Sequence, residues 1–76
     1  MFIDKNEEVE CIESFTVGDI GSFTVEKGTI FWGTHRQSNE SVEIENASGS
    51  LKLPTRLFEK YFQKTGRRLQ GAKGNL

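Results

Sequence analysis

The feature that most constrains the fold is the run from Val17 to Gly33, in which apolar and polar residues alternate around glycines. Alternation with a period of two is typical of a β-strand, and a glycine between two such stretches supplies the backbone freedom of a turn. We expect a sharply bent β-hairpin, with residues 21–26 as its first strand, Glu26-Lys27-Gly28 as its loop and residues 29–35 as its return strand. This pattern predicts a small, strongly curved β domain.

Further strands are predicted on both sides of this run. Residues 8–17 read as a first strand or an irregular extended segment. Val42 and Ile44 alternate with Glu43 and Glu45, which predicts a half-buried strand with its carboxylates outward. A turn over 46–49 then leads to a paired strand over 51–53.

A helix is predicted after Pro54, which cannot continue a sheet. Thr55 is placed to cap a helix over residues 55–65, and Gly66 is placed to end it. Its apolar positions share one helix face, whereas charged residues occupy the opposite face. The apolar positions are Leu57, Phe58, Tyr61 and Phe62.

These elements predict a mainly β fold with one C-terminal helix. We expect a small SH3-like barrel or β-roll of four to five antiparallel strands. A five-stranded oligonucleotide-binding barrel is the main rival, but it usually needs more than the 76 residues present. The domain is expected to span residues 9–65, between a flexible acidic N-terminus over 1–8 and a mobile basic tail over 66–76.

The return strand is apolar on both faces. Ile30 and Trp32 point one way and Phe31 points the other, so both faces need cover. The simplest account places the C-terminal helix over Trp32, which favours a buried tryptophan. If the helix packs elsewhere, Trp32 becomes an exposed binding surface.

Charge is distributed unevenly along the chain. Residues 1–26 carry seven acids against one lysine, and residues 51–76 carry seven bases against one acid, although the whole chain has a net charge of −1. The two ends either neutralise each other or face different partners. The basic end is the only nucleic-acid signal, and its candidate phosphate contacts are Lys60, Lys64, Arg67, Arg68 and Lys73.

Candidate site residues are few. Trp32, His35 and Arg36 form one candidate contact surface, because an arginine beside a tryptophan can hold a phosphate or carboxylate. Glu43 and Glu45 form another. A single histidine and a single cysteine, Cys11, favour neither a metal site nor a disulfide, and no catalytic or cofactor motif is present.

A family resemblance is carried by five short stretches within residues 15–63. They are Val17-Gly18-Asp19-Ile20-Gly21, Val25-Glu26-Lys27-Gly28-Thr29, Val42-Glu43-Ile44-Glu45, Leu51-Lys52-Leu53-Pro54 and Leu57-Phe58-Glu59-Lys60-Tyr61-Phe62. With them the chain resembles short SH3-like accessory proteins of phages and prophages of Gram-positive bacteria. The resemblance implies a protein that inhibits a host factor, sequesters a small signalling molecule or joins a phage assembly.

We therefore expect a non-catalytic binding module without a cofactor. The favoured activity is occlusion of a host protein, with capture of a small nucleotide-like ligand as a variant and nucleic-acid binding as the alternative. The acidic N-terminus and the lack of a long apolar run indicate a cytoplasmic protein with no membrane partner. A domain of this size also gains from forming a homo-oligomer.

Overall fold

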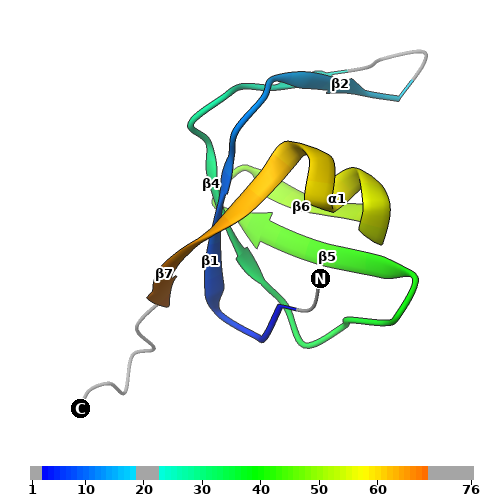
Figure 1. Ribbon diagram of the computed structural model, residues 1–76. Coiled ribbons are helices and arrows are strands. Elements are labelled where there is room, and N and C mark those ends of the chain that lie inside the picture. Colours follow the sequence, from blue (N-terminus) through cyan, green and yellow to red (C-terminus); the bar gives the residue numbers. More distant parts are fainter. Residues whose placement is uncertain (1–2, 19–22, 69–76) are drawn as a thin grey trace.

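The computed structural model describes residues 3–18 and 23–68, which form seven strands and one short helix (Figure 1). In chain order the elements are β1 (Glu7–Cys11), β2 (Phe15–Val17), β3 (Phe23–Val25), β4 (Ile30–Gly33), β5 (Ser41–Asn46), β6 (Gly49–Pro54), α1 (Thr55–Tyr61) and β7 (Phe62–Arg68).

Five strands form one antiparallel sheet in the order β6-β5-β4-β1-β7. The other two strands, β2 and β3, pair with each other above it. Within residues 3–18 and 23–68 no ladder joins β6 to β7, so this sheet is open, with two edges. The predicted mainly β class and the small antiparallel sheet with one helix are confirmed.

The hairpin predicted over residues 21–35 is wrong in its pairing. β3 pairs with β2, the strand before it in the chain, and not with β4, which pairs with β1 and β5. Gly28 does make the turn, with φ at +96°, but its N–H donates to the carbonyl oxygen of Cys11 at 2.7 Å. That bond directs the chain onto β1 instead of back along β3.

The second predicted hairpin is confirmed. β5 and β6 pair from Ser41 with Pro54 to Asn46 with Gly49. Only Ala47 and Ser48 connect the two strands, and the Asn46 side chain accepts a hydrogen bond from the Ser48 N–H at 2.9 Å. Gly49 then takes a φ of +146°, which side chains disfavour.

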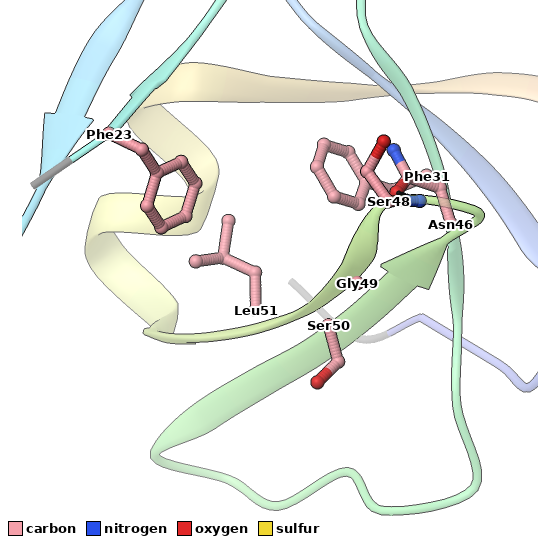
Figure 2. Close-up of a pocket in the computed structure, with 7 residues that line it drawn as sticks. All are labelled: Phe23, Phe31, Asn46, Ser48, Gly49, Ser50 and Leu51. Carbon is pink, nitrogen blue, oxygen red and sulfur yellow. Dashed lines mark hydrogen bonds between the residues drawn. The ribbon is translucent and has the colours of Figure 1, made fainter.

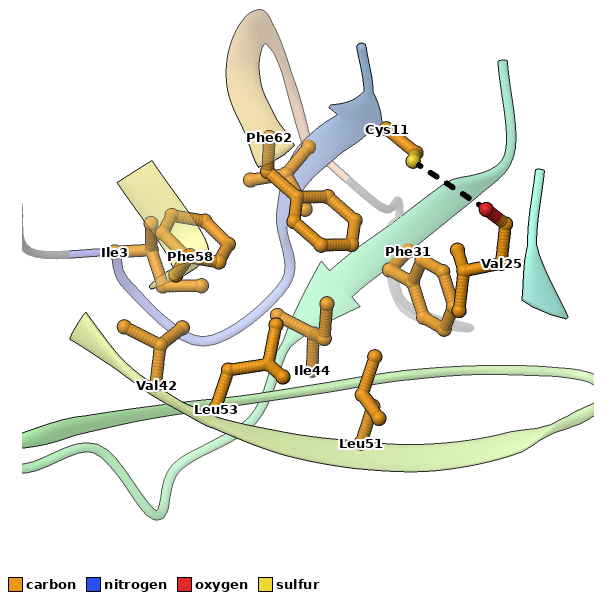
Figure 3. Close-up of a cluster of buried hydrophobic side chains, with 11 residues drawn as sticks. Ile3, Cys11, Val25, Phe31, Val42, Ile44, Leu51, Leu53, Phe58 and Phe62 are labelled. Carbon is orange, nitrogen blue, oxygen red and sulfur yellow. Dashed lines mark hydrogen bonds between the residues drawn. The ribbon is translucent and has the colours of Figure 1, made fainter. Parts of the chain in front are cut away.

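The core lies between the inner face of the sheet, the β2–β3 hairpin and α1 (Figure 3). Phe58 of α1 stacks on Phe62 with ring centroids 5.2 Å apart, and Phe62 meets the edge of Phe31 at 5.7 Å. Phe15 of the hairpin stacks on Tyr61 at 4.4 Å. Buried rings of this kind supply much of the apolar burial of a small domain.

α1 does not cover Trp32, which corrects the expected arrangement. The helix buries Phe58 on the face of β4 that carries Phe31, and Trp32 alternates to the opposite face. The tryptophan is therefore partly exposed on the outer side of the sheet. One face of β4 is covered by the helix side of the domain, and the other carries Trp32.

The N-terminal segment is docked where a flexible lead-in was expected. Ile3 is fully buried beside Phe58 and Val42 in the core. The Asn6 N–H donates to the Gly33 carbonyl oxygen at 2.8 Å. Residues 3–6 therefore cross the end of β4, and residues 7–11 enter the sheet as β1.

The helix is shorter than predicted, and a strand replaces its last four residues, 62–65. α1 ends at Tyr61 because Phe62 turns to an extended backbone, and Thr55 makes no capping bond but donates to the Asn39 carbonyl oxygen. β7 then pairs with β1, with Gly66 at a φ of +88° inside a bulge instead of at a helix end. Residues 66–68 of the expected tail thus belong to β7, whereas 69–76 lie outside the described residues.

Candidate functional site

The candidate site is the outer face of the sheet around Trp32. β4 places Trp32 between two carboxylates, with Glu8 of β1 on one side and Glu45 of β5 on the other. Ile30 precedes it on the same face and lies opposite Glu10 of β1. We call this surface the outer face; it comprises Glu8, Glu10, Ile30, Trp32, Glu43 and Glu45.

The loop after β4 folds back onto this face. The Gln37 side chain donates to the carbonyl oxygens of Thr34 and Glu43, each at 2.8 Å, and accepts from the Glu43 N–H at 3.2 Å. This side-chain amide pairs with the Glu43 backbone as a strand residue would. Arg36, held beside it, donates through Nε to Glu43 Oε2 at 2.9 Å and forms an ion pair with that carboxylate.

Two carboxylates of the outer face are compensated by arginines. The hydrogen bond from Arg36 holds the pKa of Glu43 below its usual value, and the same bond raises the pKa of Arg36. The Thr65 hydroxyl donates to Glu8 at 2.6 Å, and with Arg67 it lowers the pKa of Glu8. Both acids therefore stay ionised and paired.

The other two carboxylates are less compensated, although the more distant charge of Arg36 also acts on Glu45. Neither Glu10 nor Glu45 forms an ion pair with any described part of the chain. Beside Glu45 lies a hollow of about 220 Å³, lined by Trp32, Glu45, Asn46 and Ala47. The hollow thus has one aromatic wall and one carboxylate that lies outside the described ion pairs.

The structure brings together most of the residues proposed from the sequence. Trp32, Arg36, Glu43 and Glu45 share the outer face, so the two predicted surfaces are one. His35 is exposed in the adjoining loop. Sequence reasoning missed Glu8 and Glu10, although their alternation with Val9 and Cys11 was a strand signal that would have placed them on one face.

The basic residues of the nucleic-acid alternative are mostly paired. Lys64 contacts Glu7 at 3.3 Å, Arg67 contacts Glu8 at 2.7 Å and Arg68 contacts Asp4 at 3.8 Å. Lys60 lies over the Tyr61 ring, 5.3 Å from its centroid, and Lys73 falls outside the described residues. The acidic and basic ends of the chain therefore meet along the β1–β7 ladder.

The β2–β3 hairpin is flanked by two apolar clefts. One, of about 200 Å³, lies between Phe23, Phe31, Leu51 and the β5–β6 turn, and Figure 2 shows the two rings on either side of Leu51. The other, of about 390 Å³, lies between the hairpin and α1 and includes Val17 and Leu57. Phe23 is 53% exposed, the highest value among the large hydrophobic residues described.

Other sites receive little support in the described part of the chain. No group of three or more histidine, cysteine or acidic side chains is arranged to hold a metal ion there. Cys11 is fully buried, and this burial raises the pKa of its thiol. No helix among residues 3–18 and 23–68 has the length and apolar character to cross a membrane.

Comparison of the chain with protein-family models, with curated proteins and with solved structures gives no match.

Proposed function

We propose that the protein is a non-catalytic binding module that occludes a host protein, as a phage-encoded inhibitor would. We also propose that its domain is SH3-like. The strand order β6-β5-β4-β1-β7, with a hairpin after β1 and a short helix before β7, supports this class.

One observation carries the proposal: Trp32 stands on a sheet face that α1 leaves uncovered. Tryptophan is enriched at the centres of protein interfaces, where it supplies a large contact area at low entropic cost. Here the indole is framed by acidic side chains on both neighbouring strands. Such a face suits a protein surface that offers positive charge and an apolar contact.

A second candidate function, capture of a small ligand, is favoured by the cleft between the hairpin and α1. Its volume of about 390 Å³ and its largely apolar lining fall within the range of small-molecule sites. Nucleic-acid binding has weaker support, because Lys64, Arg67 and Arg68 already face carboxylates of the same chain.

Affinity capture from host lysate tests the proposal. The wild-type chain, Trp32→Ala and Phe23→Ala would be immobilised after circular dichroism shows that each is folded. Phe23 is the matched control, because it is an exposed aromatic residue of the hairpin and not of the outer face. We expect Trp32→Ala to lose the retained protein and Phe23→Ala to keep it. Full retention by folded Trp32→Ala would contradict the outer face as the contact surface, and loss by Phe23→Ala alone would move the site to the hairpin clefts.

A further inference from the structure

We propose that the outer face binds an arginine-bearing segment of the partner protein, with the guanidinium held over Trp32 between Glu10 and Glu45. This inference rests on the proposed function and names the chemistry of its partner. Three features support it: the register of the strands, the two carboxylates that lie outside the described ion pairs, and the hollow beside the indole.

The register places both carboxylates within reach of one bound side chain. Glu45 lies directly opposite Trp32, and Glu10 lies opposite Ile30, diagonal to Trp32. Directly paired side chains begin about 5 Å apart and diagonal ones about 7–8 Å apart. A cation seated on the indole therefore lies beside both acids.

The charges leave that position open for a cation. Arg67 forms an ion pair with Glu8 and Arg36 with Glu43, so both arginines have other carboxylates as direct partners, although the charge of Arg36 also acts on Glu45 at longer range. Lys52 lies on β6 opposite Glu43, one strand further from Trp32. The described ring–cation pair of the chain joins Lys60 to Tyr61, and none of the described cations lies over Trp32. A basic ligand would thus meet two carboxylates outside any described ion pair and a partly exposed indole.

The hollow favours arginine in particular. Its volume of about 220 Å³, between the indole and the start of the β5–β6 turn, takes a long side chain with an apolar stem. A guanidinium stacks on an indole and at the same time offers planar donors to a carboxylate, which the compact ammonium of lysine does less well. Arginine is also enriched at interface centres.

Peptide titration tests this inference with a neutral analogue of the same shape. The probes are acetyl-Gly-Arg-Gly-Arg-Gly-amide and the peptide in which citrulline replaces both arginines. The readout is the indole N–H signal of Trp32, which is unambiguous because the chain has one tryptophan. We expect the arginine peptide to shift this signal at low salt and to lose its effect near 0.5 M salt, whereas the citrulline peptide leaves it unchanged.

Paired variants separate the two acids from general charge. Glu10→Gln with Glu45→Gln should weaken binding of the arginine peptide by about fivefold, the loss expected for two partly exposed ion pairs. Glu26→Gln with Glu40→Gln makes the same change in net charge at exposed positions elsewhere and should bind as the wild type does. Equal shifts with the citrulline peptide, or equal weakening by the two double variants, would overturn the inference.

The same double variants distinguish this inference from the proposed function. If lysate capture depends on Trp32 but is unchanged in Glu10→Gln/Glu45→Gln, the binding module stands and the arginine-bearing partner is excluded. If capture is independent of Trp32, the proposed contact surface fails, whatever the peptide does. Support for both requires that capture and peptide binding fall together in Glu10→Gln/Glu45→Gln.

Discussion

Replacing Gly33 with alanine tests whether the N-terminal segment is docked as described. A Cβ at this position would lie 2.3 Å from the Asp4 carbonyl oxygen and 3.0 Å from Ile3 Cδ1. Real Cβ atoms essentially never approach closer than 3.0 Å, so the Asp4 carbonyl must move by at least 0.7 Å. The substitution therefore pushes residues 3–6 away from the end of β4 without changing any charge.

Two opposing effects set the magnitude. Alanine restricts the unfolded chain and would stabilise an unhindered site by about 0.4–1 kcal/mol. Overpacking against backbone costs about 1–3 kcal/mol. Displacing residues 3–6 also weakens the hydrogen bond from the Asn6 N–H to the Gly33 carbonyl oxygen, which is worth about 1 kcal/mol. The same displacement exposes part of the buried Ile3 side chain. We expect a net loss of about 2 kcal/mol, against a total stability of about 4–11 kcal/mol for 76 residues.

Urea unfolding followed by the fluorescence of Trp32 and by far-ultraviolet circular dichroism measures this loss. The midpoint should fall while the slope of the transition stays the same. A double-mutant cycle with Ile3→Ala identifies the cause. Once Ile3 no longer anchors the segment, Gly33→Ala should cost at least 1 kcal/mol less than it does in the wild type.

Two results would refute the reasoning. A Gly33→Ala protein as stable as the wild type, or more stable, would mean that nothing opposes the new methyl group. If the stability losses of Gly33→Ala and Ile3→Ala add in the double mutant within about 0.5 kcal/mol, the clash at Gly33 does not act through the segment that Ile3 anchors.

Three further predictions concern the core, the acid pairs and the buried thiol. Phe58→Ala should cost about 3–5 kcal/mol in urea unfolding because the side chain is fully buried, whereas Leu57→Ala, 38% exposed, should cost much less; equal costs would contradict the orientation of α1. Because the pKa of Glu8 is lowered in the folded state, its contribution is present above the unfolded value near 4.5 and is lost as the pH falls through the folded value. Glu8→Gln should therefore be less stable than the wild type at pH 7 and converge with it in acid, and a difference that persists in acid would argue against this pairing. Cys11 should react with a thiol reagent slowly in the native protein and rapidly in urea, so a fast native reaction would contradict its burial and raised pKa.

Local patterns predicted the elements better than their partners. The alternation through Val42 and Ile44 and the short turn before Gly49 identified β5 and β6, because a tight hairpin is set by neighbouring residues. Phe58 and Phe62 were predicted on the apolar face of one helix; both are buried in the core, although only Phe58 belongs to the helix. The pattern could not show that the helix ends at Tyr61, because Phe62 lies four residues after Phe58 and so continues the apolar helix face in the sequence.

The sequence patterns did not predict which strands pair across long stretches of the chain. The bond between Gly28 and Cys11, which separates β4 from β3, depends on a contact with a distant strand and leaves no local signal. The side of β4 that the helix covers depends on the same topology, and the favoured placement of Trp32 beneath the helix was therefore wrong. For this reason the sequence predicted the residues of the outer face that lie on β4 and β5 but missed those on β1.

The ladder between β1 and β7 also determines when the chain can finish folding. Its contacts join residues as far apart as Glu8 with Thr65 and Lys5 with Arg68. Closing so large a loop costs entropy before any contact repays it, so we expect this ladder to form late and to limit the folding rate. During synthesis, one edge of β1 stays unpaired until residues 62–68 have left the ribosome. A chain interrupted before that point carries an open strand edge, which is a template for aggregation.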